Sequence, residues 1–207
     1  MTRHYFDPSP ESRHDPRTVS LVLPDIHLRL QTDRGVFSPE QVDLGTRILL
    51  ETVPPPPSQG QLVDLGCGYG PIALTMAARS RDARVVGVDV NQRSVELARF
   101  NAKNNHLYNV DCIMGAQEQA PTDFLTGPID ALWSNPPIRI GKPALHQLLR
   151  TWLTHLSATA AAHLVVHHHL GADSLQRWLD SQQFPCTRIA SRSGYRVLRV
   201  DSPGAMP

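Results

Sequence analysis

Short apolar runs recur along the chain, and helical spacing fills the segments between them. The runs at residues 62–65, 85–88, 110–114, 129–133 and 164–167 have the length of buried strands. Before the last of these runs, Leu145, Leu148 and Leu149 recur at the three- and four-residue spacing of a helix face. Strands that alternate with helices in this way predict a parallel sheet with helices on both faces.

Two further patterns predict antiparallel strands at the two ends of the chain. Residues 19–23 and 26–31 alternate around Pro24-Asp25, which indicates a small N-terminal β-hairpin. Residues 187–190 and 195–200 are joined by a short polar turn and place one antiparallel strand in the main sheet. We therefore expect an α/β domain over residues 19–200 with a mostly parallel, seven-stranded sheet. An irregular arm at 1–18 precedes it and a disordered tail at 201–207 follows it.

A helix is predicted over residues 39–52. Ser38 and Gln41 form a capping box, and Pro39 occupies the favoured first helical position. The prolines at 54–57 would end this helix.

Composition narrows the class of protein. A chain of 207 residues is long enough for one domain with its own core. It has no apolar run near 18 residues and no N-terminal signal pattern, so we expect a soluble cytoplasmic protein without membrane contacts. The net charge of +1 lacks the basic excess that marks many nucleic-acid binders, although nearly all the cations are arginine.

Neither the cysteines nor the histidines have metal-binding spacing. Cys67, Cys112 and Cys186 are scattered, which predicts buried core residues. A nucleophilic role for Cys67 would need a base that the sequence does not supply. Residues 167–169 are three consecutive histidines, and neighbouring strand residues point to opposite faces, so we expect no metal there.

Three alternate glycines follow the first buried strand. Gly66, Gly68 and Gly70 come directly after Leu65, and Pro71 opens the next helix. Glycines allow positive φ and close approach to a ligand, and the N–H groups at a helix start form a polar cradle. The spacing is neither that of dinucleotide-binding loops nor that of phosphate-binding loops.

Two more strand ends carry polar groups. Asp89 ends the second strand, where an acid accepts hydrogen bonds from the two hydroxyls of a ribose. The run at 129–133 closes with Ser-Asn-Pro-Pro-Ile, at residues 134–138. The sequence therefore predicts a nucleoside site at one edge of the sheet.

Together these three segments resemble the class I S-adenosylmethionine-dependent methyltransferases that carry an Asn-Pro-Pro motif after the fourth strand. Gly-Val-Phe-Ser at 35–38 and Val-Asp-x-Gly-Thr at 42–46 are similar to the bacterial ribosomal RNA guanine-N2 methyltransferases and their single-domain relatives. The resemblance implies a Rossmann-like fold, S-adenosylmethionine as cofactor and ribosomal RNA as substrate. Asn-Pro-Pro motifs also serve protein glutamine and adenine N6 methylation, and a non-catalytic cofactor-binding module is a further alternative.

The resemblance also implies roles for individual residues. The expected cofactor-binding residues are Phe37, Asp64, Gly66, Cys67, Gly68, Gly70, Asp89, Val90, Ala116, Gln117 and Asn135. The expected catalytic residues are Asn135, Pro136, Pro137 and Ile138, and the expected substrate-binding residues are Arg139, Lys142 and His169. Ala116 stands where the family carries an acid that accepts from adenine, so adenine recognition stays unassigned.

Some of these roles have structural alternatives. Phe37 either flanks the cofactor or acts as a hydrophobic staple, and Arg139 and Lys142 either bind phosphate or form a solvated helix start. Arg192, Arg196 and Arg199 form a second candidate RNA face. Both a monomer and a homodimer remain open.

The expected chemistry uses positioning rather than a metal. The lone pair of an exocyclic amine is delocalised into the base, which makes the amine a poor nucleophile. Acceptors at the Asn135 side-chain oxygen and the Pro136 carbonyl would orient it, and consecutive prolines restrict the backbone and offer no competing donor.

Overall fold

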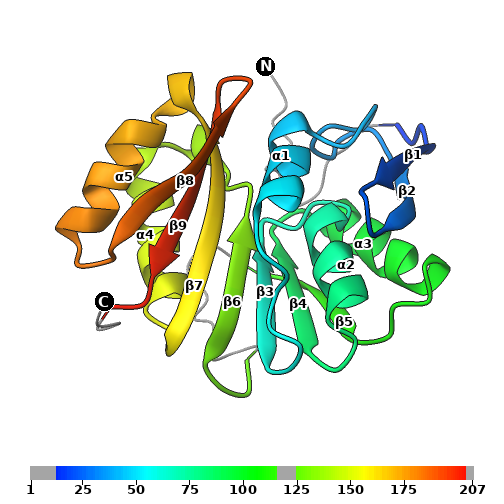
Figure 1. Cartoon of the computed structure of the whole chain (residues 1–207). Coiled ribbons are helices and arrows are strands. Elements are labelled where there is room, and N and C mark those ends of the chain that lie inside the picture. The colour runs from blue at the N-terminus through cyan, green and yellow to red at the C-terminus, as the bar shows by residue number, and fades with distance from the viewer. Residues whose placement is uncertain (1–12, 116–124, 204–207) are drawn as a thin grey trace.

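The computed structural model describes residues 13–115 and 125–203 of the chain. A seven-stranded sheet runs through the molecule with helices on both faces (Figure 1). Its strands are β3 (Gln61–Leu65), β4 (Arg84–Asp89), β5 (Val110–Met114), β6 (Ile129–Ser134), β7 (Leu156–His167), β8 (Cys186–Arg192) and β9 (Tyr195–Asp201). The helices are α1 (Leu44–Thr52), α2 (Pro71–Arg79), α3 (Gln92–Asn104), α4 (Lys142–Leu153) and α5 (Ala172–Ser181), and the 3-10 turns are η2 (Ile138–Ile140) and η3 (His168–Leu170).

The strand order across the sheet is β5-β4-β3-β6-β7-β9-β8. Neighbouring strands from β5 to β7 pair in parallel, whereas β9 pairs antiparallel with both β7 and β8. This arrangement confirms the predicted fold class, including the single antiparallel strand. After β5 the chain returns to β6, beside β3, so the strand order reverses between β3 and β6.

Two apolar layers hold the helices on the sheet. Along β3, Leu62 packs in the layer with α1 and α2, and its neighbour Val63 packs in the layer with α4 and α5. All five residues of β3 are buried, because both faces of the strand are covered. Each fully buried aliphatic side chain of this kind contributes about 1.5–3 kcal/mol. No helix in the described part of the chain is both long and apolar enough to cross a membrane.

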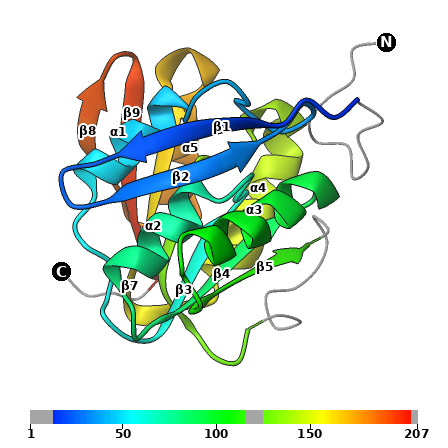
Figure 2. The same ribbon diagram turned by 90° about the vertical axis from the view of Figure 1, so that its right-hand side faces the viewer.

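The predicted N-terminal hairpin is present as β1 (Arg17–Val22) and β2 (His27–Thr32), and it lies against α3 (Figure 2). Two asparagine side chains on α3 bind its backbone edge. Asn101 Oδ1 accepts from Gln31 N at 2.7 Å and its Nδ2 donates to Gln31 O at 2.9 Å. Asn105 makes the same pair of bonds with Arg29, at 3.2 and 2.9 Å. One turn of helix separates these asparagines, so their amides satisfy the edge of β2 as a third strand would.

Several predicted boundaries shift in the structure. The helix predicted from Pro39 begins instead at Leu44, because Ser38 has φ +49° and its hydroxyl donates to the Gln41 carbonyl at 2.7 Å, which closes a turn. Asp43 is the N-cap, accepting from Thr46 N at 3.0 Å. The last parallel strand, predicted at 164–167, begins eight residues earlier, at Leu156. The helices and strands of the described chain extend from residue 17 to residue 201.

The loop between β3 and α2 takes its shape from the glycines and from Asp64. Gly66, Gly68 and Gly70 all have positive φ, at +80°, +55° and +99°. Asp64 Oδ2 accepts from Ala73 N, in the first turn of α2, at 2.8 Å, whereas its buried Oδ1 has no hydrogen-bond partner among the described residues. Burial raises the pKa of Asp64 to about 8, since the carboxylate is cut off from water.

We expect Asn101→Ala to lower the free energy of unfolding by about 2–4 kcal/mol, because a fully buried side chain loses its bonds to the hairpin and to the Tyr69 carbonyl. Asn105→Ala is the matched control and should cost about 1 kcal/mol, since its bonds to the hairpin lie near solvent. Urea unfolding of both variants measures the difference. Equal losses would contradict the assigned roles.

We expect Asp64 to make stability pH-dependent in the ligand-free protein. Its pKa rises from 3.8 to about 8 on folding, so the folded state binds the proton more tightly. The stabilisation is complete below about pH 4 and is lost as the pH rises toward 8. Relative to Asp64→Asn, the wild-type free energy of unfolding should therefore fall by about 1 kcal/mol per pH unit between pH 5 and pH 8. Urea unfolding across this pH range measures the difference. If the free energies of wild type and Asp64→Asn change with pH in the same way, Asp64 is already ionised in the folded protein at pH 5.

Candidate active site

A pocket lies at the carboxyl ends of β3, β4 and β6, where the strand order reverses. Open parallel sheets bind ligands at this position, because the two flanking connections leave in opposite directions and open a crevice. Residues from the glycine loop, the β4 end, the Asn-Pro-Pro segment and the start of α1 line it together. The polar groups predicted at the three strand ends therefore share one site.

Asp89, the last residue of β4, connects the glycine loop to the start of α3. Its Oδ2 accepts from Gly68 N at 2.8 Å and its Oδ1 accepts from Asn91 N at 2.9 Å. Burial raises the pKa of Asp89, and these N–H groups partly offset that effect. Each carboxylate oxygen keeps a second lone pair, so Asp89 can still accept from the hydroxyls of a ligand.

The glycine loop leaves its inner side open. A Cβ atom on Gly68 would meet nothing within 4 Å, so the backbone itself faces free space. Gly66 N and Cys67 N both donate to the Val88 carbonyl, at 2.8 and 3.0 Å, which fixes the loop on the end of β4. A hydrogen bond with Cys112 and burial raise the pKa of the Cys67 thiol, which disfavours a nucleophilic role.

The Asn-Pro-Pro segment is held against the same loop. Ser134 Oγ donates to the Leu65 carbonyl at 2.5 Å, which ties the end of β6 to the end of β3. Ile138 N donates to the Pro136 carbonyl at 2.8 Å, and Pro137 has φ −74° and ψ 71°, the geometry of an inverse γ-turn. The Pro136 carbonyl keeps one lone pair for a ligand, on a backbone with little freedom.

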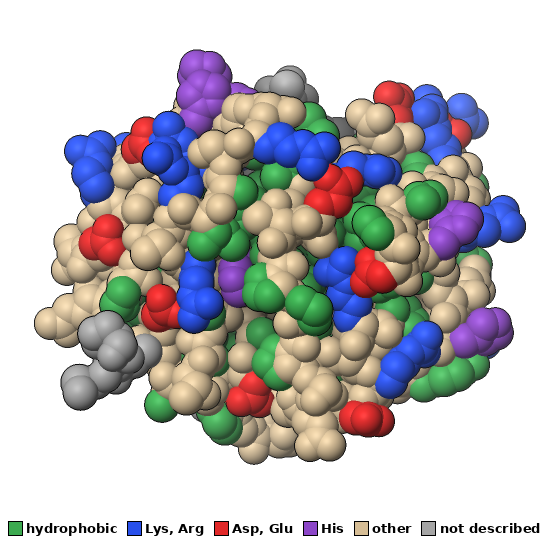
Figure 3. Space-filling model, in the orientation of Figure 1, with side chains coloured by type: hydrophobic (Ala, Val, Ile, Leu, Met, Phe, Trp, Pro, Cys, Tyr) green, Lys and Arg blue, Asp and Glu red, His purple; other side chains and the backbone are tan. Residues whose placement is uncertain are grey.

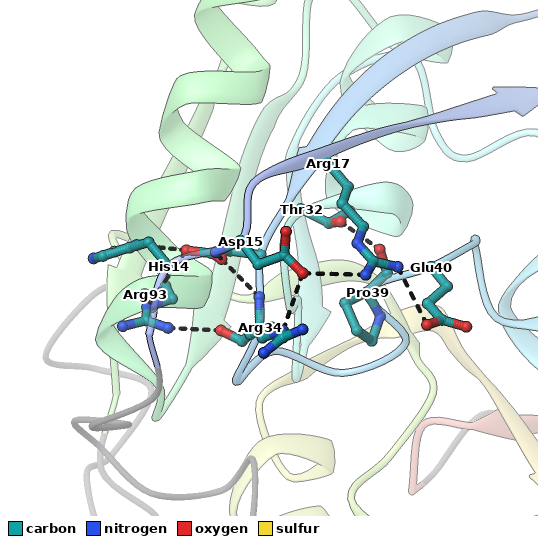
Figure 4. Close-up of polar contacts among 9 residues, drawn as sticks. His14, Asp15, Arg17, Thr32, Arg34, Pro39, Glu40 and Arg93 are labelled. Carbon is teal, nitrogen blue, oxygen red and sulfur yellow. Dashed lines mark hydrogen bonds and ion pairs between the residues drawn. The ribbon is translucent and has the colours of Figure 1, made fainter.

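A connecting segment, residues 33–43, closes the site on the side of α1. We call it the strap; it contributes Phe37 and Asp43 to the pocket. At its start, Asp33 accepts from Asp15 N and pairs with His14, both at 2.6 Å. Burial alone would raise the pKa of Asp33, but these hydrogen bonds lower it below its usual value. Figure 4 shows this network of charged side chains where the N-terminal segment meets the strap.

Helix α3 anchors the strap beside Asp89. Arg93 Nη1 donates to the Arg34 carbonyl at 2.7 Å (Figure 4). Asn91 Nδ2 donates to the Gly35 carbonyl at 3.1 Å. Further along the strap, Thr32 Oγ1 donates to the Pro39 carbonyl at 2.5 Å. The strap is therefore fixed to the same helix start that follows the acid of β4.

Many of the residues predicted from the sequence line this pocket. They are Phe37, Gly66, Cys67, Gly68, Asp89, Val90, Asn135, Pro136 and Pro137. Ala116 and Gln117 lie outside the described residues, although Gly115, immediately before them, lines the pocket. Phe37 is 37% exposed at the pocket wall, consistent with the flanking position of the two alternatives.

Two residues predicted to bind cofactor shape the loop from behind. Asp64 is fully buried and holds the start of α2, and it is not among the residues that line the pocket. Gly70 is the N-cap of α2, where a Cβ atom would lie 2.6 Å from Leu74 Cδ1. Both act on the pocket through the position of the loop.

The three residues predicted to bind substrate, together with Ile138 from the predicted catalytic residues, do not line the pocket. Ile138 packs against the apolar layer under α4. Arg139 is exposed in η2, and Lys142 is exposed at the first residue of α4. His169 is exposed in η3, with its ring centroid 3.7 Å from that of His168. Their contacts with substrate stay predictions.

The second candidate RNA face is largely neutralised by acidic partners. Arg192 pairs with Glu51 at 2.5 Å, Arg199 pairs with Asp201 at 2.8 Å, and Arg196 pairs with Asp173. These arginines therefore have less charge to offer a phosphate than their sequence pattern indicates.

The sequence reasoning missed four polar residues of the pocket wall: Asp43, Thr46, Tyr69 and Ser94. Asp43 Oδ2 accepts from Asn135 Nδ2 at 2.8 Å, so the strap contacts the Asn-Pro-Pro segment directly. The Asp-x-Gly-Thr pattern was the available signal, because Asp followed by Thr three residues later is also a helix start. Burial, with a smaller contribution from the Asp43 charge, raises the pKa values of Tyr69 and Tyr195.

These features fit an adenosine-containing cofactor with a charged tail. The Asp89 carboxylate can accept from hydroxyls, and the bare backbone at Gly68 admits close approach. Leu65, Val88 and Val90 supply apolar wall. Oδ1 of Asp64, buried in β3 behind the loop, has no hydrogen-bond partner among the described residues and is an acceptor that a water or a cationic group could satisfy.

Comparisons with known proteins place the chain in a family. The family model described as methyltransferase small domain matches residues 27–199. An uncharacterized protein YbxB of Bacillus subtilis is 30% identical over 97% of this chain and 98% of its own length. The ribosomal RNA small subunit methyltransferase C of Ectopseudomonas mendocina is 31% identical over 87% of this chain but only 53% of its own.

A solved structure from T. thermophilus, its 16S rRNA N2 G1207 methyltransferase in complex with AdoMet and guanosine, has a TM-score of 0.76. That structure is 22% identical and covers 93% of this chain and 52% of its own, so it shows the shared fold. The chain thus spans about half the length of the ribosomal RNA methyltransferases it matches. This chain belongs to the methyltransferase small domain family and is an S-adenosylmethionine-dependent methyltransferase.

Proposed function

We propose that this enzyme methylates the exocyclic N2 amine of guanine in ribosomal RNA. The observation that carries the proposal is the Asn-Pro-Pro segment, whose Asn135 and Pro136 line the pocket beside the glycine loop. Relatives that match most of this chain are ribosomal RNA methyltransferases, and one similar structure is a complex with AdoMet and guanosine. These names support ribosomal RNA over protein or DNA.

The pocket supplies acceptors for an amine. When bound, S-adenosylmethionine supplies a methyl group made electrophilic by its positively charged sulfur. Asn135 and the Pro136 carbonyl accept hydrogen bonds from the target NH₂, which orients the nitrogen lone pair toward the methyl carbon. Methyl transfer to that nitrogen would break the methyl carbon–sulfur bond of the cofactor, and the methylated amine would lose its proton to solvent. This reaction requires no buried general base.

Asp89 and the glycine loop bind the nucleoside part of the cofactor in this proposal. The Asp89 carboxylate accepts from the ribose hydroxyls while it holds Gly68 N and Asn91 N. Phe37 and Val90, which line the pocket, would contact the base, and the open backbone at Gly68 would admit the rest of the cofactor. The cofactor and the acceptor amine thus occupy adjoining parts of one pocket.

The start of α4 offers charge for an RNA backbone. Arg139 and Lys142 are exposed and have no ion-pair or hydrogen-bond partner among the described residues. Burial and the charges of Lys142 and Arg150 lower the pKa of His146, which indicates a positive local potential. Figure 3 shows Lys and Arg side chains scattered among Asp and Glu on the face that it draws, with no continuous basic surface there.

Transfer of labelled methyl tests the acceptor. The enzyme is incubated with radiolabelled S-adenosylmethionine and, in separate reactions, with unmodified ribosomal RNA from a deletion strain, release-factor protein and DNA. We expect label in RNA only, at guanine N2 by mass spectrometry of nucleosides. Label only in protein or DNA would overturn the RNA assignment, and tight cofactor binding without any transfer would favour a non-catalytic module.

Two substitutions should separate cofactor binding from turnover. Asp89→Ala should weaken S-adenosylmethionine binding by about 10- to 100-fold, because hydrogen bonds to a charged acceptor are lost. Asn135→Ala should lower kcat by about 100-fold while leaving the cofactor Kd nearly unchanged. Asp111→Ala, an exposed acid on neighbouring β5, is the control for Asp89. Calorimetry measures the cofactor affinity of each variant. Equal losses of affinity in Asp89→Ala and Asn135→Ala would contradict the separate roles.

The proposed phosphate contacts predict a salt-dependent effect. Replacing both Arg139 and Lys142 by Ala should weaken RNA binding and reduce the salt slope of binding by about 1.5. Arg188→Ala, which removes an exposed cation on β8, is the control and should change neither quantity. Filter binding of RNA at several salt concentrations measures the slope. An unchanged slope in the double variant would show that these side chains are only a solvated helix start.

A further inference from the structure

The side chain of Asn135 is held by the start of α1, a contact that the motif alone does not disclose. Its Nδ2 donates to Asp43 Oδ2 at 2.8 Å and to Thr46 Oγ1 at 3.1 Å. Asp43 is the N-cap of α1 and Thr46 lies in its first turn. Both partners come from a segment 89 to 92 residues away in the chain.

The chemistry of these partners determines which way the amide faces. A carboxylate at Asp43 is an acceptor only, so the amide must present its NH₂ group to it and not its oxygen. The contact with Thr46 occupies the second N–H. Oδ1 is then the remaining polar atom of Asn135, and no N–H or O–H group of the described residues donates to it. The pocket therefore meets a pure acceptor at this position.

The position of Asp43 is itself constrained from two sides. Oδ2, the atom that accepts from Asn135, also accepts from Thr46 N at 3.0 Å as part of the helix cap. On the other side, a Cβ atom on Gly45 would lie 2.9 Å from Asp43 Oδ2 and 2.5 Å from Tyr195 Cε1. A side chain at residue 45 would collide with both the carboxylate and the Tyr195 ring, so glycine at this position allows Asp43 to take its place at the cap.

We propose that Asp43 is a positioning residue that, with Thr46, locks the Asn135 amide with Oδ1 toward the substrate. The lock makes the site selective for an acceptor that donates hydrogen bonds, such as an amine, and against one that presents a carbonyl oxygen. Without it the amide can rotate by half a turn and present NH₂, which would meet the N–H groups of the target amine unfavourably. This inference deepens the proposed function and rests on it for its catalytic consequence.

Three substitutions at Asp43 separate helix capping from amide orientation. Asp43→Ser keeps a strong N-cap oxygen for Thr46 N, but its side chain is one bond too short to reach Asn135. Asp43→Asn keeps the length and an oxygen at the position of Oδ2, so it can make both bonds. Asp43→Ala removes both. Thermal unfolding reports the cap, which should be weakened in Asp43→Ala and retained in the other two.

Turnover reports the lock. We expect Asp43→Ser and Asp43→Ala to lower kcat by about 10- to 100-fold with the cofactor Kd within about twofold, and Asp43→Asn to restore most of the activity. Thr46→Val, which removes one acceptor at nearly constant volume, should lower kcat by about threefold to tenfold. Wild-type kcat in Asp43→Ser, or an equal loss in Asp43→Ser and Asp43→Asn, would overturn the proposal.

A measurement without substrate keeps the proposal separate from the proposed function. In isotope-labelled protein the Asn135 side-chain NH₂ protons should exchange slowly with water, because both are hydrogen-bonded, and exchange should accelerate in Asp43→Ser but not in Asp43→Asn. Equal exchange in wild type and Asp43→Ser would overturn the lock even if the enzyme is active. If the exchange result holds but wild type methylates no RNA, the proposed acceptor is wrong and the lock stands.

Discussion

The parallel pairing of β3 with both β4 and β6 is the constraint on which the site depends. The register places Leu65 opposite Val88 and Asp64 opposite Trp133, so the three strands end within about one residue of each other. Three loops distant in the chain therefore leave the sheet at one edge. The Ser134 hydroxyl on the Leu65 carbonyl then joins the two loops on either side of the point where the strand order reverses.

Two carboxylates use the same physical device on opposite sides of the pocket. Asp89 holds backbone N–H groups of the glycine loop and of the α3 start, and Asp43 holds the first turn of α1 and the Asn135 amide. Each carboxylate is held by N–H groups of the protein, and these hydrogen bonds offset part of the free-energy cost of shielding its negative charge from water. Each also sets the position of a neighbouring group, so local backbone capping and ligand geometry are coupled.

Helix α3 connects the periphery to the site. Its N-terminus follows Asp89 and anchors the strap through Arg93, and its later turns bind the edge of the hairpin through Asn101 and Asn105. A small two-stranded sheet has little stability of its own in water, so these side-chain bonds and the apolar contacts of Leu21 and Leu30 hold it in place. The hairpin and strap thereby become one wall of the pocket.

The sequence by itself determined the alternation of strands and helices, the glycine loop, the acid at the second strand end and the Asn-Pro-Pro segment. It did so because buried strands and helix starts leave strong local patterns of apolar residues, glycine and proline. It predicted the helix before β3 five residues early, since the cap at Ser38 closes a turn and Asp43 caps the helix instead. The first part of β7, rich in alanine, carries no strand pattern, and its pairing with β6 and β9 makes it a strand. Only the tertiary structure decided that Asp43 and Thr46 face Asn135, because a contact across some 90 residues depends on how the sheet brings α1 to β6, and no local spacing encodes it.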